Sequence, residues 1–380
     1  MKRLTAFLVA AAMLAMLLAG CSGTTSTPSS NPIGPDISDP APTSDVQAVE
    51  YPEMTVLMSE YGVEYVTLPI QWFKEIVEKR TDGKITIEIH GNSELGNAKA
   101  HMELISTGVA DGGSVTSLFS GAMALNNNIA CIPFGIDDPV KAFEAAMAFV
   151  ELHPELYAEW EAQNIHPVSM GACTDYGLIS QKEITSPSDL SGLRIGCSVT
   201  SYTMALNAVG AVPTVTTAAE NYQNYQNNVV DGGINPTSTV QTNKYYEVTN
   251  YFYDMHASWA TVGTVIGFNL DFWNGLPTQV QELFDEVGYE VAARISEYEA
   301  GAKSEQIAEI ATGSTVGELS DEFVSEWLSQ MMDNPETNVI ISAKAALDAA
   351  GYDGAAMIRD YVKCVEDAGF TIPLDVDAYL

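Results

Sequence analysis

The segment Glu220–Pro236 reads ENYQNYQNNVVDGGINP, and its order of residues indicates how the fold around it is built. It begins with the spacing of an amphipathic helix, which breaks at Asn227-Asn228. The apolar pair Val229-Val230 then predicts a short buried strand, and Asp231-Gly232-Gly233 predicts a turn after it. A helix that leads into a buried strand is typical of α/β sheets, in which ligands bind beyond the carboxyl ends of the strands.

Asn235 is the residue of this segment that is best suited to recognise a ligand. It precedes Pro236, which biases its backbone toward an extended conformation, so that its amide can project into a cleft. The amide can both donate and accept hydrogen bonds. From composition alone, ordinary scaffold is the more common explanation of such a segment, because Asx–Gly turns are frequent. The surrounding chain changes that balance.

The composition limits the classes of function. With 380 residues, the chain is long enough for two domains with a sizeable core. Its 50 acidic and 16 basic residues give a net charge of −34, which argues against binding of nucleic acid or anionic membranes through the folded body. The five histidines are scattered and the cysteines follow no zinc spacing, so we expect no metal and no cofactor.

The chain also lacks the motifs of an enzyme. It has no GxSxG nucleophile elbow, no GxxxxGK[ST] phosphate loop and no GxGxxG after the first strand, and we expect no catalytic residue. The cysteines beyond the N-terminal segment leave two states open: a Cys173–Cys197 disulfide, or free thiols buried at Cys131, Cys173, Cys197 and Cys364.

The N-terminus has the pattern of a targeting segment. Lys2 and Arg3 precede an uncharged apolar run that is too short for a comfortable membrane span, and Leu18-Ala19-Gly20-Cys21 follows. This pattern resembles bacterial lipoprotein signals, which implies that residues 1–20 are cleaved and that Cys21 carries the lipid. A simple N-terminal membrane anchor is the alternative. Residues 21–52, rich in Ser, Thr, Pro and Asp, predict a flexible tether with a reach of roughly 30 Å.

Strand and helix patterns alternate from Met54 onward. Runs with a period of 2 and runs with a period of 3.6 residues follow one another at 55–58, 67–80, 85–89, 98–106 and 111–115. Alternation of this kind predicts a largely parallel sheet with helices on both faces. Further along, apolar residues at helical spacing predict one long helix over 277–312, which would be about 45 Å long.

Five stretches resemble one known family in order and spacing. They are KRTDGKITIEIHGNSELGNAKAHMELISTGVADGG (79–113), SPSDLSGLRIG (186–196), AAENYQNYQNNVVDGGINP (218–236), NKYYEV (243–248) and GFNLDFWNGLP (267–277). Together they are similar to the solute-binding proteins of tripartite ATP-independent periplasmic (TRAP) transporters, the DctP-like family. The similarity covers roughly Met54 to Ala311.

The resemblance implies an α/β fold of two lobes, like that of periplasmic binding proteins. Each lobe would hold a mixed or mostly parallel sheet flanked by helices. Residues 54–173 with about 261–300 would form lobe I and residues 174–260 lobe II. The helix over 277–312 would brace both lobes, and residues 313–380 would form a helical extension at the C-terminus.

A binding protein of this kind needs polar groups in a cleft that can close. We expect them at strand ends, and the ligand-binding candidates are Ser59, Glu60, Thr116, Tyr176 and Asn235. Secondary candidates are Tyr65, Arg194, His256 and Trp259.

Two departures from the family concern arginine. The resemblance places Gly196 where carboxylate-binding members carry an arginine, and Tyr176 where some members carry a second one. Arg194 shares the face of Gly196 but lies about 6–7 Å farther along the strand. A buried carboxylate without a paired charge is costly, and so acidic a protein disfavours a dianion. We therefore expect a neutral, zwitterionic or weakly anionic ligand, whose ring could stack on Tyr176 or Trp259.

These observations predict an extracytoplasmic lipoprotein, at the cell surface or in the periplasm, that captures a small organic metabolite between its lobes. The metabolite would be an organic acid or a neutral or zwitterionic compound, and a TRAP-type permease would receive it. The lipid anchor would be the only contact with the membrane. Two alternatives stay open: a ligand-sensing lipoprotein for a membrane receptor, and a lipoprotein hydrolase, against which the missing nucleophile motif weighs.

Overall fold

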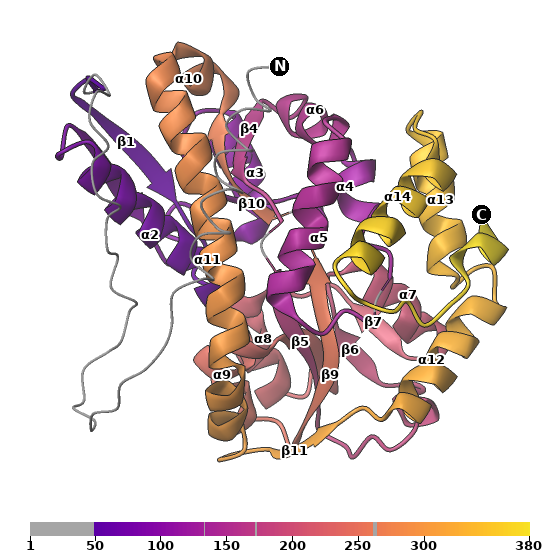
Figure 1. Cartoon of the computed structure of the whole chain (residues 1–380). Helices are drawn as coiled ribbons and strands as arrows, with labels where there is room; N and C mark the ends of the chain where they lie inside the picture. The colour runs from indigo at the N-terminus through magenta and orange to yellow at the C-terminus, as the bar shows by residue number, and fades with distance from the viewer. Residues whose placement is uncertain (1–48, 133, 172, 261–263) are drawn as a thin grey trace, which may run out of the picture.

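The computed structural model describes residues 49–132, 134–171, 173–260 and 264–380, without the side chains of 173, 258–260 and 264. The predicted signal peptide, Cys21 and nearly all of the predicted tether lie outside the described residues. The described chain forms two sheets with helices around each, and the two lobes lie one above the other in Figure 1. This arrangement confirms the predicted two-lobed α/β fold.

Lobe I is built on a five-stranded sheet in the order β2-β1-β3-β10-β4. Its strands are β1 (Met54–Ser59), β2 (Ile85–His90), β3 (Gly112–Thr116), β4 (Ile165–Ser169) and β10 (Thr264–Asn269). The first three strands are parallel to one another, and β10 is antiparallel to both of its neighbours. The helices that follow β1 and β2 are α2 (Glu64–Arg80) and α3 (Ala98–Ser106).

Lobe II is built on a six-stranded sheet in the order β11-β9-β5-β8-β6-β7. Its strands are β5 (Cys173–Ser180), β6 (Arg194–Gly196), β7 (Val212–Thr214), β8 (Gly232–Pro236), β9 (Tyr251–Ala260) and β11 (Thr315–Glu318). Its helices are α7 (Thr200–Ala208), α8 (Ala218–Gln226) and α9 (Thr237–Thr242). The chain passes between the two sheets three times, from β4 to β5, from β9 back to β10, and from β10 to β11.

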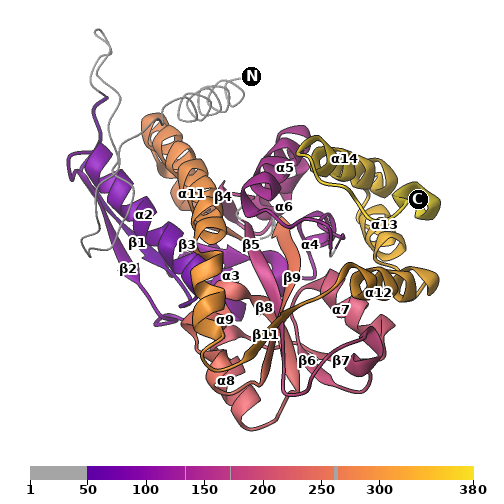
Figure 2. The same ribbon diagram turned by 60° about the horizontal axis from the view of Figure 1, so that its bottom comes forward.

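One helix of 33 residues, α11 (Thr278–Ile310), runs along both lobes. It packs against α2 and β4 of lobe I and against α9 and β5 of lobe II, and Figure 2 shows it extending from beside α2 to the foot of lobe II. At 1.5 Å per residue such a helix is about 50 Å long, more than one lobe needs. The predicted brace between the lobes is thereby confirmed.

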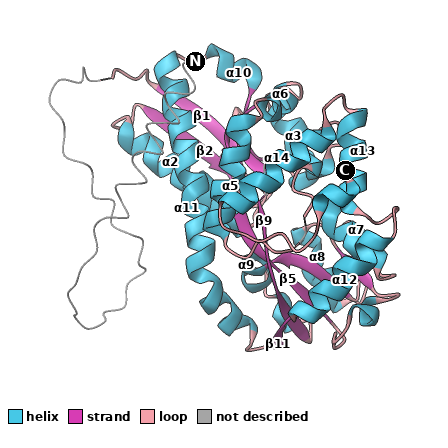
Figure 3. Cartoon of the chain, turned by 45° about the vertical axis from the view of Figure 1, so that its right-hand side comes forward, coloured by secondary structure: helices cyan, strands magenta, loops and turns pink. Residues whose placement is uncertain are grey.

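Shorter helices complete lobe I and the C-terminal region. They are α4 (Ala124–Asn128), α5 (Pro139–Leu152), α6 (Glu155–Glu161), α10 (Leu270–Gly275), α12 (Asp321–Asp333), α13 (Val339–Ala349) and α14 (Gly354–Asp367). The C-terminal helices touch both lobes, because α12 packs on α7 while α13 and α14 pack on α4 and α5 (Figure 3). The extension is not wholly helical, since β11 joins the edge of the lobe II sheet beside β9.

The segment Glu220–Pro236 differs from its prediction in two respects, because the turn comes before Gly232 and the strand begins there. Helix α8 ends at Gln226, and the chain turns through Asn228, whose φ is 53°. Val229 is 51% exposed and belongs to that turn, so the predicted strand at Val229-Val230 is wrong. The strand of this segment is β8, which begins at Gly232. A Cβ at this position would lie 2.3 Å from the carbonyl oxygen of Ile179 on β5, so only glycine allows the two strands to pair this closely. This glycine permits close strand pairing rather than a turn.

Candidate functional site

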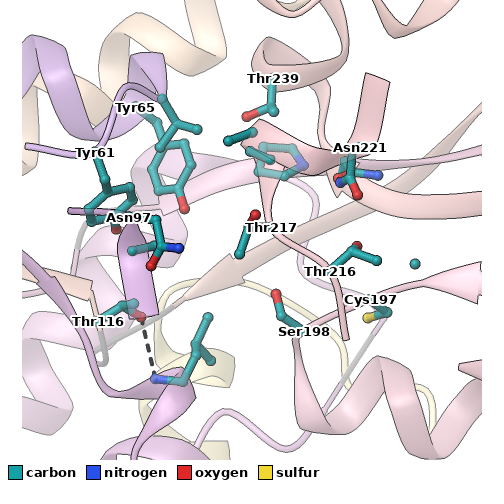
Figure 4. Close-up of a pocket in the computed structure, with 18 of the residues that line it drawn as sticks. Tyr61, Tyr65, Asn97, Thr116, Cys197, Ser198, Thr216, Thr217, Asn221 and Thr239 are labelled. Carbon is teal, nitrogen blue, oxygen red and sulfur yellow. Dashed lines mark hydrogen bonds between the residues drawn. The ribbon is translucent and has the colours of Figure 1, made fainter. Parts of the chain in front are cut away.

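A pocket lies between the two lobes, with a volume of about 90 Å³ measured over the positions that the centre of a water molecule can take. A single water needs roughly 10–15 Å³ by this measure, so the pocket holds several waters or a small organic molecule. The polar residues that lobe I contributes are Tyr61, Tyr65, Ser93, Asn97 and Thr116. Those of lobe II are Tyr176, Ser198, Thr216, Thr217, Asn221, Asn235 and Thr239 (Figure 4).

The structure brings together four of the predicted residues in this pocket. Tyr65 follows β1, Thr116 ends β3, and Tyr176 and Asn235 lie on the paired strands β5 and β8. The hydroxyl of Thr116 accepts a hydrogen bond of 3.4 Å from the backbone N–H of Leu118, which fixes the turn that follows β3. Residues far apart in the sequence thus meet because β3, β5 and β8 all direct their ends toward the gap between the lobes.

A chain of hydrogen bonds holds the amide of Asn235. Its Oδ1 accepts from Nδ2 of Asn221 at 2.9 Å, and its Nδ2 donates to the hydroxyl of Tyr225 at 3.0 Å. All three side chains are buried. One N–H and one lone pair of the Asn235 amide are therefore left over, fewer than the sequence alone led us to expect. The two hydrogen bonds fix the orientation of the remaining N–H and lone pair of the Asn235 amide.

The tyrosines around the pocket are neutral hydroxyls. Burial raises the pKa of Tyr65 to about 12, and the neighbouring Glu299 adds to this shift. Burial likewise holds the pKa values of Tyr61 and Tyr176 well above their usual range. The ring of Tyr176 packs 5.4 Å from that of Tyr202, and the ring of Tyr61 stands edge-on to His101 at 5.1 Å. These contacts position hydroxyl groups that can donate and accept.

Ser59 and Glu60 lie behind the pocket wall rather than in it. Ser59 is fully buried, and its hydroxyl lies 3.4 Å from Nε2 of His101. The carboxylate of Glu60 accepts hydrogen bonds from the backbone N–H of Gly62, from the hydroxyl of Thr67 at 2.7 Å and from the N–H of Asn92 at 2.6 Å. Glu60 therefore shapes the loop that carries Tyr61 into the pocket.

Arg194 and His256 are not among the described residues that line the pocket. Arg194 forms a two-pronged ion pair with Asp231, with Nε 3.0 Å from Oδ2 and Nη2 3.0 Å from Oδ1, at the exposed start of β6. His256 lies on β9 with Nε2 3.0 Å from Oε2 of Glu318 on β11. The side chain of Trp259 lies outside the described part of the chain.

Sequence reasoning missed most of the hydroxyl and amide side chains of the pocket. They are Tyr61, Ser93, Asn97, Ser198, Thr216, Thr217, Asn221 and Thr239. One signal was present, because Ser198 follows β6 just as Thr116 ends β3. Another was the sequence Thr216-Thr217-Ala218-Ala219 at the start of α8, where Thr217 and Glu220 form a capping box.

The three cysteines whose side chains are described are buried free thiols, and one of them, Cys197, lines the pocket. Cys131, Cys197 and Cys364 are free and buried, so Cys197 forms no disulfide with Cys173. Burial raises the pKa of Cys131 to about 12 and that of Cys197 to about 11, which makes both thiols unreactive. Within the described residues, no group of three His, Cys, Asp or Glu side chains could hold a metal ion. No described helix is both long and apolar enough to cross a membrane.

Comparison with known proteins places this architecture in a family. The family model described as bacterial extracellular solute-binding protein, family 7 (DctP), matches residues 65–335. The chain is 25% identical over 245 residues to the ectoine/5-hydroxyectoine-binding periplasmic protein UehA of Ruegeria pomeroyi, which covers 63% of this chain and 70% of UehA. It is 30% identical over 187 residues to the uncharacterized protein y4mM of Sinorhizobium fredii, covering 47% of this chain and about a third (33%) of y4mM.

Among solved structures, a TRAP periplasmic solute-binding protein from Desulfovibrio salexigens with bound orotic acid has the same fold. Its TM-score is 0.71 at 21% identity, and the match covers 83% of this chain and 99% of that one. The two lobes and the pocket between them define a solute-binding protein rather than an enzyme. This chain belongs to the bacterial extracellular solute-binding proteins of family 7, the solute-binding proteins of TRAP transporters.

Proposed function

We propose that this protein is the lipid-anchored receptor of a TRAP-type transporter. It captures a small organic solute when its lobes close on the pocket, and it delivers that solute to a membrane permease. The pocket carries this proposal, because its polar residues come from both lobes, an arrangement in which closure of the lobes would enclose a solute. Thr116, Tyr176 and Asn235 are the principal ligand contacts, and Tyr65 adds a further hydroxyl.

Binding of a solute is tested by dialysis. The purified protein is equilibrated with a small-molecule extract of bacterial cells, freed of unbound solute and analysed by native mass spectrometry. We expect one retained solute for each protein chain, together with a higher melting temperature. Retention of no solute would refute the proposal.

Replacing Asn235 with alanine is expected to weaken binding of the retained solute by at least about tenfold, because the loss of one well-placed hydrogen bond has about this effect. It should also lower the free energy of unfolding by about 1–3 kcal/mol, since Asn221 and Tyr225 lose a buried partner. Tyr225→Phe is the matched control, because Tyr225 bonds to Asn235 without lining the pocket. Equal affinities for the two variants, measured calorimetrically, would mean that Asn235 acts only through the scaffold.

Replacing Cys21 with serine tests the proposed anchor. Without a sulfur to carry the lipid, the protein is expected to move from the membrane fraction to the soluble extracytoplasmic fraction. Immunoblots of fractionated cells measure this distribution, and the intact mass of the wild-type protein reports the lipid. A serine variant that stays with the membrane would show that another segment holds it there.

A further inference from the structure

The pocket has an unusual charge composition for a site that would hold a carboxylate. Its described lining consists of hydroxyl, amide, thiol and apolar side chains, and none of these carries a formal charge at neutral pH. Between residues 49 and 380, the side chains that the structure does not describe belong to Pro133, Ala172, Cys173, residues 258–263 and Thr264, and none of these residues has a side chain with a formal charge at neutral pH. A charged group on a bound solute would therefore meet no oppositely charged side chain in the described lining, and a charged residue from outside the lining would have to reach it.

Two described cations near the pocket wall are already paired with carboxylates, and a third is exposed beside a lining residue. Arg194 is held by Asp231, and Lys303 lies between Asp175 and Asp254, 3.2 and 3.0 Å from their carboxylates. Lys99 is exposed, and its ammonium lies 5.9 Å from the centre of the Phe119 ring, which lines the pocket. Lys99 is therefore the described cation that an anionic solute could recruit.

Thr216 occupies the space above Gly196, deep in lobe II. A Cβ on Gly196 would lie 2.9 Å from Oγ1 of Thr216, closer than such atoms approach in real structures. A long cationic side chain at position 196 would have to displace that threonine. The place from which a cation could enter the pocket along β6 is thus filled by a neutral hydroxyl.

Helices α2, α3, α8 and α9 all begin at or next to residues that line the pocket, and the positive ends of their dipoles could attract an anion. Side chains of the protein already interact with three of these ends. Glu64 places a negative charge in the first turn of α2, and Oδ1 of Asn97 accepts from the N–H of Lys99 in the first turn of α3, at 3.1 Å. At α8 the carboxylate of Glu220 accepts from the N–H of Thr217 at 3.0 Å and places a negative charge in the first turn. The ends of α2, α3 and α8 therefore offer little to a second anion, and α9, with six residues, has only a short stack of peptide dipoles.

Two buried oxygens in the pocket wall have no hydrogen-bond partner among the described residues. They are Oδ1 of Asn221 and Oγ1 of Thr239, on residues that are 3% and 2% exposed. Oδ1 of Asn221 can only accept a hydrogen bond, as any amide oxygen does, whereas the hydroxyl of Thr239 can accept or donate. A buried acceptor without a donor is costly, and a solute that supplies an N–H or O–H removes that cost.

We infer that the pocket selects a solute that has no net charge and presents N–H or O–H donors, such as a hydroxylated compound, a lactam or a primary amide. This inference rests on the proposed function and names the class of solute. The donors meet Asn221 and Thr239, and the tyrosine hydroxyls and the free N–H of Asn235 meet the carbonyl or hydroxyl oxygens of the solute.

The dialysis experiment separates this inference from the function on which it rests. The solute retained by the wild-type protein is released by denaturation and identified by its mass and fragmentation. A compound without net charge at pH 7 is the expected result. A retained carboxylate anion would overturn the inference and leave solute binding standing, whereas an empty pocket would count against both.

Matched pairs then isolate charge from shape. Uracil and orotic acid, galactose and galacturonate, and the amide of pyroglutamate and pyroglutamate itself differ chiefly in one carboxylate. In each pair that binds, calorimetry is expected to give the neutral member an affinity at least about tenfold higher. A higher affinity for the carboxylate would overturn the inference. If Lys99→Ala then abolished that binding, Lys99 would be the cation that had been recruited.

An introduced cation provides the converse test. Thr216→Arg places a guanidinium beside Gly196 and is expected to shift the ratio of affinities toward the carboxylate by at least about tenfold. Val215→Arg adds the same charge one residue away, at an exposed position outside the pocket lining, and should leave the ratio unchanged. Equal shifts in the two variants would mean that the long-range field, not the pocket, sets the preference.

Discussion

Replacing Lys303 with methionine is expected to lower the free energy of unfolding by about 3–5 kcal/mol, because it leaves two buried carboxylates without their cation. Lys303 lies on α11, and its Nζ is 3.2 Å from Asp175 on β5 and 3.0 Å from Asp254 on β9. Burial lowers the pKa of Lys303, but the two aspartates raise it by more, so it stays charged. These ion pairs connect the bracing helix to two neighbouring strands of the lobe II sheet, β5 and β9.

The same arrangement of charges predicts which further substitutions restore the free energy of unfolding of the Lys303→Met variant. Adding Asp175→Asn and Asp254→Asn to Lys303→Met should restore most of the lost stability, since no buried charge then remains unpaired. Lys303→Arg keeps a cation and serves as the control. Urea unfolding curves measure each variant. If the methionine variant were as stable as the wild type, the aspartates would have to be solvated, contrary to their burial.

Replacing Glu299 with glutamine is expected to change the pH dependence of stability. Glu299 is buried on α11, one turn before Lys303, and one of its oxygens accepts from the hydroxyl of Thr174 at 2.9 Å. Burial raises the pKa of this carboxyl from 4.5 to about 8, against a smaller lowering by the Thr174 hydroxyl. The folded protein therefore holds a proton that the unfolded chain releases at a much lower pH.

The sign of the effect follows from this difference in proton binding. The contribution of Glu299 to stability is fully present below pH 4.5, falls as the pH rises, and is lost above about pH 8. A shift of this size corresponds to up to about 5 kcal/mol. Glutamine imitates the protonated acid, so the variant should match the wild type at pH 5 and exceed its stability by several kcal/mol at pH 9.

Denaturant titrations at several pH values measure this difference directly, because the other ionisable groups contribute equally to both proteins. Glu305→Gln, at an exposed position on the same helix, is the control and should show no such divergence. A constant difference between Glu299→Gln and the wild type from pH 5 to pH 9 would mean that Glu299 is ionised throughout.

Local patterns in the sequence were enough to place many elements. The helix over 98–106 was predicted with the ends that α3 has, and β2 was placed to within a residue. Residues next to these elements define their ends through contacts with near neighbours in the sequence. Asn97, for example, caps the N-terminus of α3. Helix α2 begins earlier than predicted, at Glu64, and contains Pro69. The apolar face of α2 packs on lobe I, and this packing stabilises the helix despite the proline within it.

The pocket was only partly predictable, because a strand end fixes where a residue lies but not which way its side chain points. Ser59 ends β1 and Glu60 follows it, and both are buried outside the pocket lining, whereas Thr116 ends the parallel neighbour β3 and lines the pocket. The register between strands decides this difference, and it is set by contacts over long sequence separations. The partners of Asn235 were hidden for the same reason, since Asn221 and Tyr225 reach it from α8.

Periodicity and turn residues act over a few neighbours at a time, so the sequence by itself determined the alternation of strands and helices and the long helix in the C-terminal half. The two-lobed arrangement came from the resemblance to the solute-binding proteins of TRAP transporters. The sequence also determined that Gly196 supplies no cation to the pocket. Only the tertiary structure showed that Arg194 forms an ion pair with Asp231 and that Thr216 fills the space above Gly196. It also showed that Oδ1 of Asn221 has no hydrogen-bond donor among the described residues. Hydrogen bonds and steric contacts between distant segments exist only once the sheets have paired.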